Sequence, residues 1–229
     1  MNDFIFENLP KMIDISCVKP NHTLEEINEM IVAAKKHQFI CAFVLPSFTP
    51  YLIEKLKDES NIMVGGTVGF PSGCDTTATK IFQAKELLKM GCDELDMVIN
   101  ITQLKSQNYQ AVFQDIKAVV DIAEKTPVKA ILEVTLLTDE EIVKASKLAV
   151  EAGVLYVKTG TGWCSNPTTV NHIKLIKATI KNQAKIKAAG GIRDLDTLME
   201  MAEAGCDRFG IGLASAMNII EQAKKYQNI

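Results

Sequence analysis

Hydrophobic positions along the chain follow two alternating spacings. Eight short runs, rich in apolar and β-branched residues, predict strands at residues 12–16, 39–45, 62–70, 94–99, 128–135, 154–158, 185–189 and 208–211. Between these runs apolar residues recur about every 3.6 positions, as in the stripe of Val112, Ile116 and Val119, which is typical of amphipathic helices. The sequence therefore predicts strands and helices in regular alternation, the pattern of an α/β protein.

Local signals mark the ends of several predicted helices. Thr23 with Glu26, and Thr138 with Glu141, have the spacing of a capping box, in which each side chain bonds an otherwise unpaired backbone N–H group. Gly153 lies between a helical stripe and the next strand, where a glycine in the left-handed conformation commonly ends a helix. These signals support the boundaries that the hydrophobic spacing indicates.

Eight strand–helix units in 229 residues predict a closed (β/α)8 TIM barrel, as a single domain over residues 1–229. The alternative is an open doubly wound sheet, which normally carries a glycine-rich nucleotide loop after its first strand. Residues 14–20, at the end of the first predicted strand, contain no glycine, which favours the barrel. No linker-like stretch or block of charge interrupts the chain, so we predict no domain boundary.

Composition and charge narrow the class of protein. Lysine and arginine number 25 and aspartate and glutamate 28, a net charge of −3, which indicates neither nucleic-acid nor membrane-surface binding. The apolar runs are far shorter than the roughly 20 residues that span a bilayer. The start of the chain does not resemble a secretory signal, and the six cysteines are scattered. We therefore expect a reduced, cytoplasmic protein, and the spacing of the three histidines predicts no metal site.

Two lysines lie near strand ends, where a barrel of this type carries its chemistry. Lys158 ends the strand at 154–158, and Lys187 lies in the strand at 185–189. Consecutive strands of a barrel are neighbours about 4.8 Å apart. Burial and a second nearby cation both favour a free amine, which can attack a carbonyl and form a Schiff base. The alternative is that one or both lysines extend to solvent and pair with acidic residues.

Three carboxylates interrupt apolar runs. Asp96 lies in an otherwise continuous apolar strand and is the best candidate for a general acid or base. Asp14 and Glu133 also have apolar neighbours in sequence. A barrel interior accepts such groups if cations neutralise them, and Lys158 and Lys187 are the expected partners. Each carboxylate, taken alone, could equally be a structural counter-ion.

Glycines follow the last two predicted strands. Gly190 and Gly191 come soon after Lys187, and Gly210 and Gly212 end the last strand. Backbone N–H groups at such positions can approach an anion, and this part of a TIM barrel is its usual phosphate site. The same glycines could be ordinary turn residues, so the prediction of a phosphate site depends on their place in the barrel.

Five segments of the chain, in order, resemble the deoxyribose-phosphate aldolase family, class I aldolases with a (β/α)8 barrel. They are residues 68–71, 94–100, 136–141, 157–162 and 187–193, and the likeness extends from about residue 13 to about residue 220. The resemblance implies a lyase that cleaves 2-deoxy-D-ribose 5-phosphate reversibly to glyceraldehyde 3-phosphate and acetaldehyde through a lysine Schiff base. It implies small sugar phosphates or aldehydes as substrates, and neither a cofactor nor a metal.

The resemblance also assigns roles to residues. Lys158 matches the Schiff-base lysine, Lys187 the second lysine that keeps this nucleophile deprotonated, and Asp96 the aspartate of the proton relay. Asp14 and Ser16 match a pair that hydrogen-bonds the substrate. The other substrate-binding residues that we expect lie in the glycine-rich segments, at Thr161, Gly162, Gly190, Gly191, Gly210 and Gly212.

The chain also departs from the family pattern. Many members have a cysteine where this chain has Phe43, and serines that contact phosphate where it has Gly212 and Leu213. Trp163, the only tryptophan, either lines the site or packs on a loop. Two alternatives therefore stay open: a related Schiff-base aldolase with a different, even unphosphorylated, aldehyde acceptor, and a non-catalytic sugar-phosphate-binding barrel. The sequence does not fix the oligomeric state, and a homo-oligomer is compatible with it.

Overall fold

Parallel strands close into a barrel in the computed structural model, which describes residues 2–227; within these residues eight strands follow one another in sequence order around the ring. They are β1 (Ile13–Cys17), β2 (Cys41–Val44), β3 (Met63–Val68), β4 (Glu94–Val98), β5 (Val128–Ile131), β6 (Tyr156–Lys158), β7 (Lys185–Ala189) and β8 (Arg208–Gly212). β1 pairs with both β2 and β8, which closes the ring. This closure confirms the (β/α)8 prediction and excludes the open doubly wound sheet.

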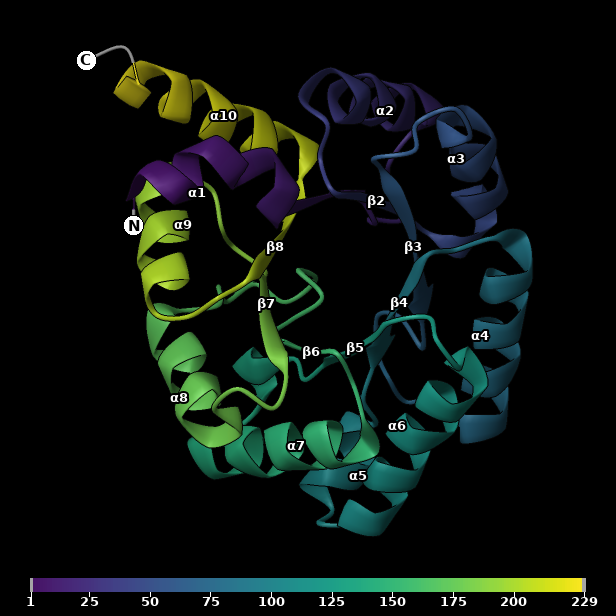
Figure 1. Cartoon of the computed structure of the whole chain (residues 1–229). Helices are drawn as coiled ribbons and strands as arrows, with labels where there is room; N and C mark the ends of the chain where they lie inside the picture. Colours follow the sequence, from purple (N-terminus) through teal and green to yellow (C-terminus); the bar gives the residue numbers. More distant parts are fainter. Residues whose placement is uncertain (1, 228–229) are drawn as a thin grey trace.

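Helices surround the barrel (Figure 1). The longer ones are α2 (Leu24–His37), α3 (Thr49–Leu56), α4 (Thr77–Met90), α6 (Tyr109–Ala123), α7 (Asp139–Ala152), α8 (Val170–Ile180), α9 (Leu195–Glu203) and α10 (Leu213–Gln227). Shorter segments are α1 (Asn2–Asn8), α5 (Ile101–Lys105) and the 3₁₀ turns η1 (Leu9–Met12), η2 (Pro46–Phe48) and η3 (Val134–Leu136). Their apolar faces join the outward side chains of the strands in one hydrophobic core. Along residues 2–227, no helix has the length and apolar character needed to cross a membrane.

The predicted helix ends form as their side chains dictate. Thr23 and Glu26 at the start of α2, and Thr138 and Glu141 at the start of α7, make both hydrogen bonds of a capping box. Gly153 ends α7 with φ 95°, in the left-handed region that is open to glycine at little steric penalty. These caps set where each helix returns the chain to the next strand.

The fifth strand is shorter than its hydrophobic run predicts. The run at 128–135 forms a strand only to Ile131, because Glu133 adopts φ 57° and the chain then enters η3. Val134 is nonetheless buried, since it packs in the turn instead of continuing the strand. The apolar run thus correctly indicates which residues are buried, but not that they continue the strand. The backbone turns at Glu133, whose side chain bonds Thr161.

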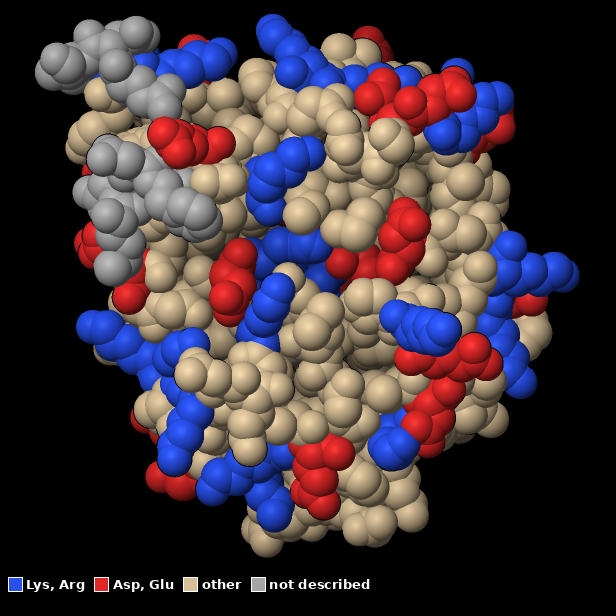
Figure 2. Space-filling view, in the orientation of Figure 1, with Lys and Arg blue, Asp and Glu red and all other residues tan. Residues whose placement is uncertain are grey.

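Strand register places the predicted site residues inside the ring. Lys158 of β6 lies directly opposite Lys187 of β7, and Asp96 of β4 lies opposite Lys129 of β5. On the face of the molecule shown in Figure 2, basic and acidic side chains are interspersed. The register thus gathers charged side chains of β4, β5, β6 and β7 inside the barrel.

Candidate active site

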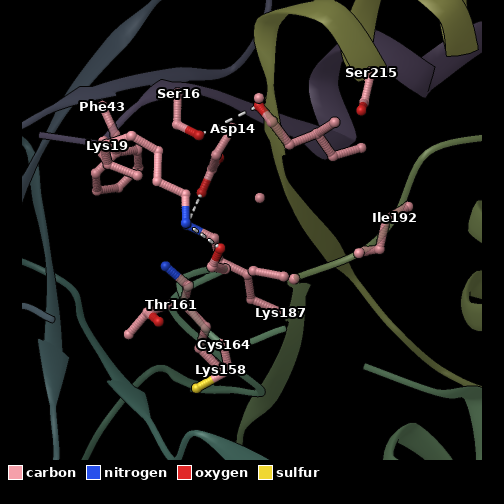
Figure 3. Close-up of a pocket in the computed structure, with 18 of the residues that line it drawn as sticks. Asp14, Ser16, Lys19, Phe43, Lys158, Thr161, Cys164, Lys187, Ile192 and Ser215 are labelled. Atoms are coloured by element: carbon pink, nitrogen blue, oxygen red, sulfur yellow. Dashed lines mark hydrogen bonds and ion pairs between the residues drawn. The ribbon is translucent and has the colours of Figure 1, made fainter. Parts of the chain in front are cut away.

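The two predicted lysines meet on one carboxylate oxygen. Lys158 Nζ and Lys187 Nζ each lie 2.7 Å from Asp96 Oδ2. Asp96 is fully buried, Lys187 is 1% exposed and Lys158 is 7% exposed, so Lys158 is the member of the trio that solvent reaches most. Figure 3 shows both lysines in the pocket near Asp14. The structure thus brings together the three residues predicted to be catalytic, with Asp96 beneath the amines.

Two further basic residues, which the sequence interpretation missed, complete a buried charge cluster. Lys129 of β5 contacts Asp96 Oδ1 at 3.1 Å and also pairs with Glu94. Arg208 of β8 bonds Glu94 Oε2 at 3.1 Å and lies 3.1 Å from Asp14 Oδ1. Lys129 interrupts an apolar strand run, the same signal that pointed to Lys158, so strand alternation could have found it. Arg208 begins its strand directly after Asp207, so it carries no such signal.

Charge balance in this cluster favours a neutral amine on one lysine. Four basic side chains surround three carboxylates, and all are buried: Lys129, Lys158, Lys187 and Arg208, with Asp14, Glu94 and Asp96. An uncompensated charge in a low-dielectric interior is costly. The cluster becomes electrically neutral when one lysine loses its proton. Lys158 is bound by a single carboxylate, whereas Lys187 also lies 2.5 Å from Asp14 Oδ2.

The pKa values of the cluster agree with this assignment. Burial, followed by the repulsion of Lys187 and Lys129, lowers the pKa of Lys158 to about 8, although Asp96 opposes the change. Burial alone would raise the pKa of Asp96, but the three lysines hold it well below its usual range. At pH 7 roughly one Lys158 in ten then carries a free amine, compared with about one in 3,000 for an ordinary lysine. Burial thus contributes more to the free amine than Lys187, the residue expected to keep it deprotonated.

The lowered pKa of Lys158 predicts how the reaction of its amine with a carbonyl substrate depends on pH. The rate constant kcat/KM should rise with pH and level off above an inflection near pH 8, because only the neutral amine attacks a carbonyl. The measurement is kcat/KM between pH 5 and 10.5 in buffers of constant ionic strength. An activity that continues to rise to pH 10, as for an unperturbed lysine, would contradict the assignment.

A pocket opens above the lysines at the C-terminal ends of the strands. All of the predicted substrate-binding residues line it: Asp14, Ser16, Thr161, Gly162, Gly190, Gly191, Gly210 and Gly212. Asp96 is not among the lining residues, and it contacts the pocket only through Lys158 and Lys187, which do line it. Asp14 lines the pocket, but both of its oxygens face basic side chains of the cluster. Ser16 Oγ donates to the Ile211 carbonyl at 3.4 Å and lies at the pocket wall.

The far end of the pocket is suited to an anion. Gly190 and Gly191 follow β7, and Gly212 immediately precedes the N-terminus of α10. Helix N-termini and exposed glycine N–H groups attract negative charge. Ser215, in the first turn of α10, and Arg193 also line the pocket, and Figure 3 shows Ser215 across the pocket from Lys158. Ser215 therefore provides a hydroxyl that the sequence interpretation considered lost at 212 and 213.

The segments that follow β1, β3 and β6 contact one another at the pocket mouth. Lys19 Nζ, from the segment after β1, donates to the Gly162 carbonyl at 2.7 Å. The indole N–H of Trp163 donates to the Val18 carbonyl at 2.9 Å, and Phe70 packs edge-on against the indole with centroids 5.9 Å apart. Trp163 is thus a loop-packing residue that joins the segments after β1, β3 and β6, and it is not among the residues that line the pocket.

Glu133 has different partners from those expected. It was predicted to pair with Lys158 or Lys187, but its Oε2 accepts hydrogen bonds from the backbone N–H of Thr161, at 3.1 Å, and from the Thr161 hydroxyl. The expected ion pair is therefore wrong. Glu133 instead fixes the loop that follows Lys158, which keeps Thr161 and Gly162 at the pocket wall.

Known aldolases resemble this chain over most of its length. A sequence model of the DeoC/LacD family of aldolases matches residues 16–222, which include Asp96, Lys158 and Lys187. A deoxyribose-phosphate aldolase of Sinorhizobium medicae is 45% identical over 215 residues, covering 94% of this chain and 87% of the relative. One from Staphylococcus carnosus is 41% identical, covering 92% and 94%. The tetrameric deoxyribose phosphate aldolase of Aeropyrum pernix has a TM-score of 0.86 at 27% identity, covering 96% and 93%.

Proposed function

Because the chain belongs to the DeoC/LacD family of aldolases, we propose that it cleaves 2-deoxy-D-ribose 5-phosphate reversibly to glyceraldehyde 3-phosphate and acetaldehyde. It is an aldehyde lyase of the deoxyribose-phosphate aldolase type. The observation that carries the proposal is the shared contact of Lys158 and Lys187 with Asp96 inside the closed barrel, at the base of the pocket. That arrangement provides the free amine that Schiff-base chemistry requires.

Lys158 is the nucleophile in this mechanism. Its neutral amine adds to the C1 aldehyde of the open-chain sugar, and the resulting carbinolamine loses water to give an iminium ion. Lys187 and Asp96 lie within hydrogen-bond distance of the attacking group or of each other, so they can take up and return the protons of these steps. The positive iminium then withdraws electrons from the C2–C3 bond, the role that a Lewis acid plays in other aldolases.

Cleavage needs a base for the hydroxyl at C3. Asp96, acting through Lys187 and a water molecule, removes that proton as the C2–C3 bond breaks, and the bond electrons move into the iminium to form an enamine. Glyceraldehyde 3-phosphate leaves, C2 of the enamine takes up a proton, and hydrolysis of the new iminium releases acetaldehyde and the Lys158 amine. General acid–base assistance of this kind contributes about 10²- to 10⁴-fold to a rate.

The glycine-rich end of the pocket is the proposed phosphate site. Gly190, Gly191 and Gly212 offer backbone N–H groups, and Ser215 offers a hydroxyl at the N-terminus of α10. Arg193, which also lines the pocket, adds positive charge. Because Ser215 supplies a hydroxyl, the departure at Gly212 no longer argues for an unphosphorylated acceptor. Phosphate at this end would place C1 of the sugar toward Lys158.

The proposal predicts a preference for the phosphorylated substrate. Retro-aldol cleavage should be much faster, by kcat/KM, with 2-deoxyribose 5-phosphate than with free 2-deoxyribose, and EDTA should leave both rates unchanged. Ser215→Glu, compared with Ser215→Ala, should raise KM for the phosphorylated sugar about 10- to 100-fold, because like charges then meet at the helix N-terminus. Equal rates for the two sugars, or loss of activity in EDTA, would overturn this assignment.

We extend the proposal to the surroundings of the enzyme. A cytoplasmic location would keep its six thiols reduced, and all six cysteines are free in the structure. Metal-independence is supported by the cluster itself, because basic side chains already occupy the space between Asp14 and Glu94, where a cation would otherwise bind. A homo-oligomer is also proposed, since the Aeropyrum pernix relative is a tetramer.

A further inference from the structure

Phe43 lies inside the barrel among charged residues. It belongs to β2, is 3% exposed and lines the pocket. Its register partner on β3 is Gly65. A Cβ atom added to Gly65 would lie only 2.0 Å from the ring of Phe43, so the ring rests on the space that this glycine leaves empty. An aromatic ring in this position requires glycine at 65.

The face of this ring is directed at the lysine amines. Lys187 Nζ lies 4.3 Å from the ring centroid, Lys129 Nζ 5.1 Å and Lys158 Nζ 5.9 Å. A cation within about 6 Å of an aromatic face is attracted to it, and the attraction is larger when water is excluded. Phe43 and its three neighbours are all buried, so the ring attracts positive charge, and it does so most strongly at Lys187, the nearest of the three amines.

This unequal contact bears on which lysine holds the proton. Lys158 and Lys187 both bond Asp96 Oδ2, and the cluster is neutral when one of them is an amine. We propose that Phe43 is a positioning residue of the aldolase reaction, whose ring holds the ammonium of Lys187 and thereby leaves the neutral amine on Lys158. The inference rests on the proposed function, because it concerns the choice of nucleophile in that mechanism.

Other titratable groups around the lysines come from several strands, and the experiment keeps them unchanged. They are Asp14 of β1, Cys41 of β2, Glu94 and Asp96 of β4, Tyr156 of β6 and Arg208 of β8. Carboxylates favour the ammonium on each lysine they contact. The ring is a neutral group that lies closer to Lys187 than to Lys158, at 4.3 against 5.9 Å.

The direct test changes the charge distribution of the ring while keeping its shape. Mono-, di- and trifluorophenylalanine, placed at position 43 of the full chain, weaken the negative face of the ring in steps. Borohydride trapping of acetaldehyde on Lys158 is then measured as a function of pH. The midpoint of the trapping curve should move upward with each fluorine, by about 0.5 to 1 pH unit across the series, because the proton becomes more favourable on Lys158.

Matched variants separate this effect from packing. The same fluorinated residues at Phe209, a buried ring on β8 whose strand neighbours face the barrel interior, should leave the midpoint unchanged. Gly65→Ala must displace the ring, so it should shift the midpoint in the same direction as Phe43→Leu. The double variant Gly65→Ala with Phe43→Leu should shift the trapping midpoint little more than Phe43→Leu alone, because both substitutions act through the same ring.

The outcomes distinguish this inference from the function on which it rests. The proposal is supported if the pH midpoint of trapping rises with each fluorine at Phe43 and stays constant with the same fluorinated residues at Phe209. Trapping on Lys158 with one midpoint for all Phe43 variants would overturn the role of the ring and leave the aldolase mechanism intact. If the unmodified protein traps no acetaldehyde on Lys158, the proposed function itself fails.

Discussion

A Lys158→Met enzyme is expected to lose essentially all retro-aldol activity, on the order of 10⁴- to 10⁶-fold in kcat, as when other enzymes lose a covalent nucleophile. Methionine keeps much of the length of the side chain but cannot form an iminium ion. The measurement is cleavage of 2-deoxyribose 5-phosphate at saturating substrate. Lys185→Met is the matched control, because Lys185 lies on the exposed first position of β7 and does not line the pocket; its activity should stay close to that of the wild type.

The same Lys158 variant should not be less stable at pH 7. The pKa of Lys158 is lower in the folded protein, about 8, than in an unfolded chain, where it is about 10.5. The unfolded state therefore binds more protons between these values, so this group contributes stability that increases as pH rises from 8 to 10.5 and disfavours folding below pH 8. Removing it should raise the free energy of unfolding at pH 7, with a smaller gain toward pH 10.

Continued turnover by a well-folded Lys158→Met protein would exclude Lys158 as the nucleophile.

Asp96→Asn is expected to have a large effect on both activity and stability. Asp96 contacts Lys129, Lys158 and Lys187, and all four side chains are buried. Asparagine keeps the size but removes the charge, which leaves the lysines with an excess of buried positive charge. Removing one partner of a buried ion pair typically lowers the free energy of unfolding by about 3–5 kcal/mol. Loss of the proton relay should lower kcat by about 10²- to 10⁴-fold.

Urea unfolding at pH 7, monitored by Trp163 fluorescence and circular dichroism, measures the free energy of unfolding of the Asp96→Asn protein. Steady-state kinetics below the unfolding transition measure its kcat. Asp121→Asn is a suitable control, because Asp121 pairs with Lys117 on the exposed surface of α6, where ion pairs contribute little. An Asp96→Asn protein as stable and as active as the wild type would show that the carboxylate does not hold the two amines.

The order of the strands explains why the proximity of Lys158 and Lys187 could be predicted from the sequence. In a barrel, strands that are consecutive in sequence become neighbours, so Lys158 at the end of β6 and Lys187 within β7 were expected to lie close together, and they are in direct register. The spacing of apolar residues was sufficient for this inference. It predicted neither which amine would be neutral nor the dominant influence of burial, because those depend on distances to Asp96 and Asp14.

Other parts of the site required coordinates. Glu133 was expected to meet a cation, but its left-handed backbone turns the side chain toward Thr161, and no sequence spacing indicates such a turn. Ser215 was overlooked because it lies three residues beyond Gly212, in the first turn of the helix that begins at Leu213, whereas phosphate binding was sought at the glycines themselves. From the sequence, Phe43 was only a departure from the family pattern. Its contact with three amines could not be predicted, because that contact depends on its register with Gly65.

The most direct test of the account is covalent capture of the Schiff base. The purified protein is mixed with acetaldehyde and sodium borohydride at pH 8, digested and mapped by mass spectrometry. The account predicts a stable ethyl adduct on Lys158, absent when borohydride is omitted and absent from the Lys158→Met protein. An unmodified Lys158 at saturating acetaldehyde, or an adduct confined to Lys187, would contradict it.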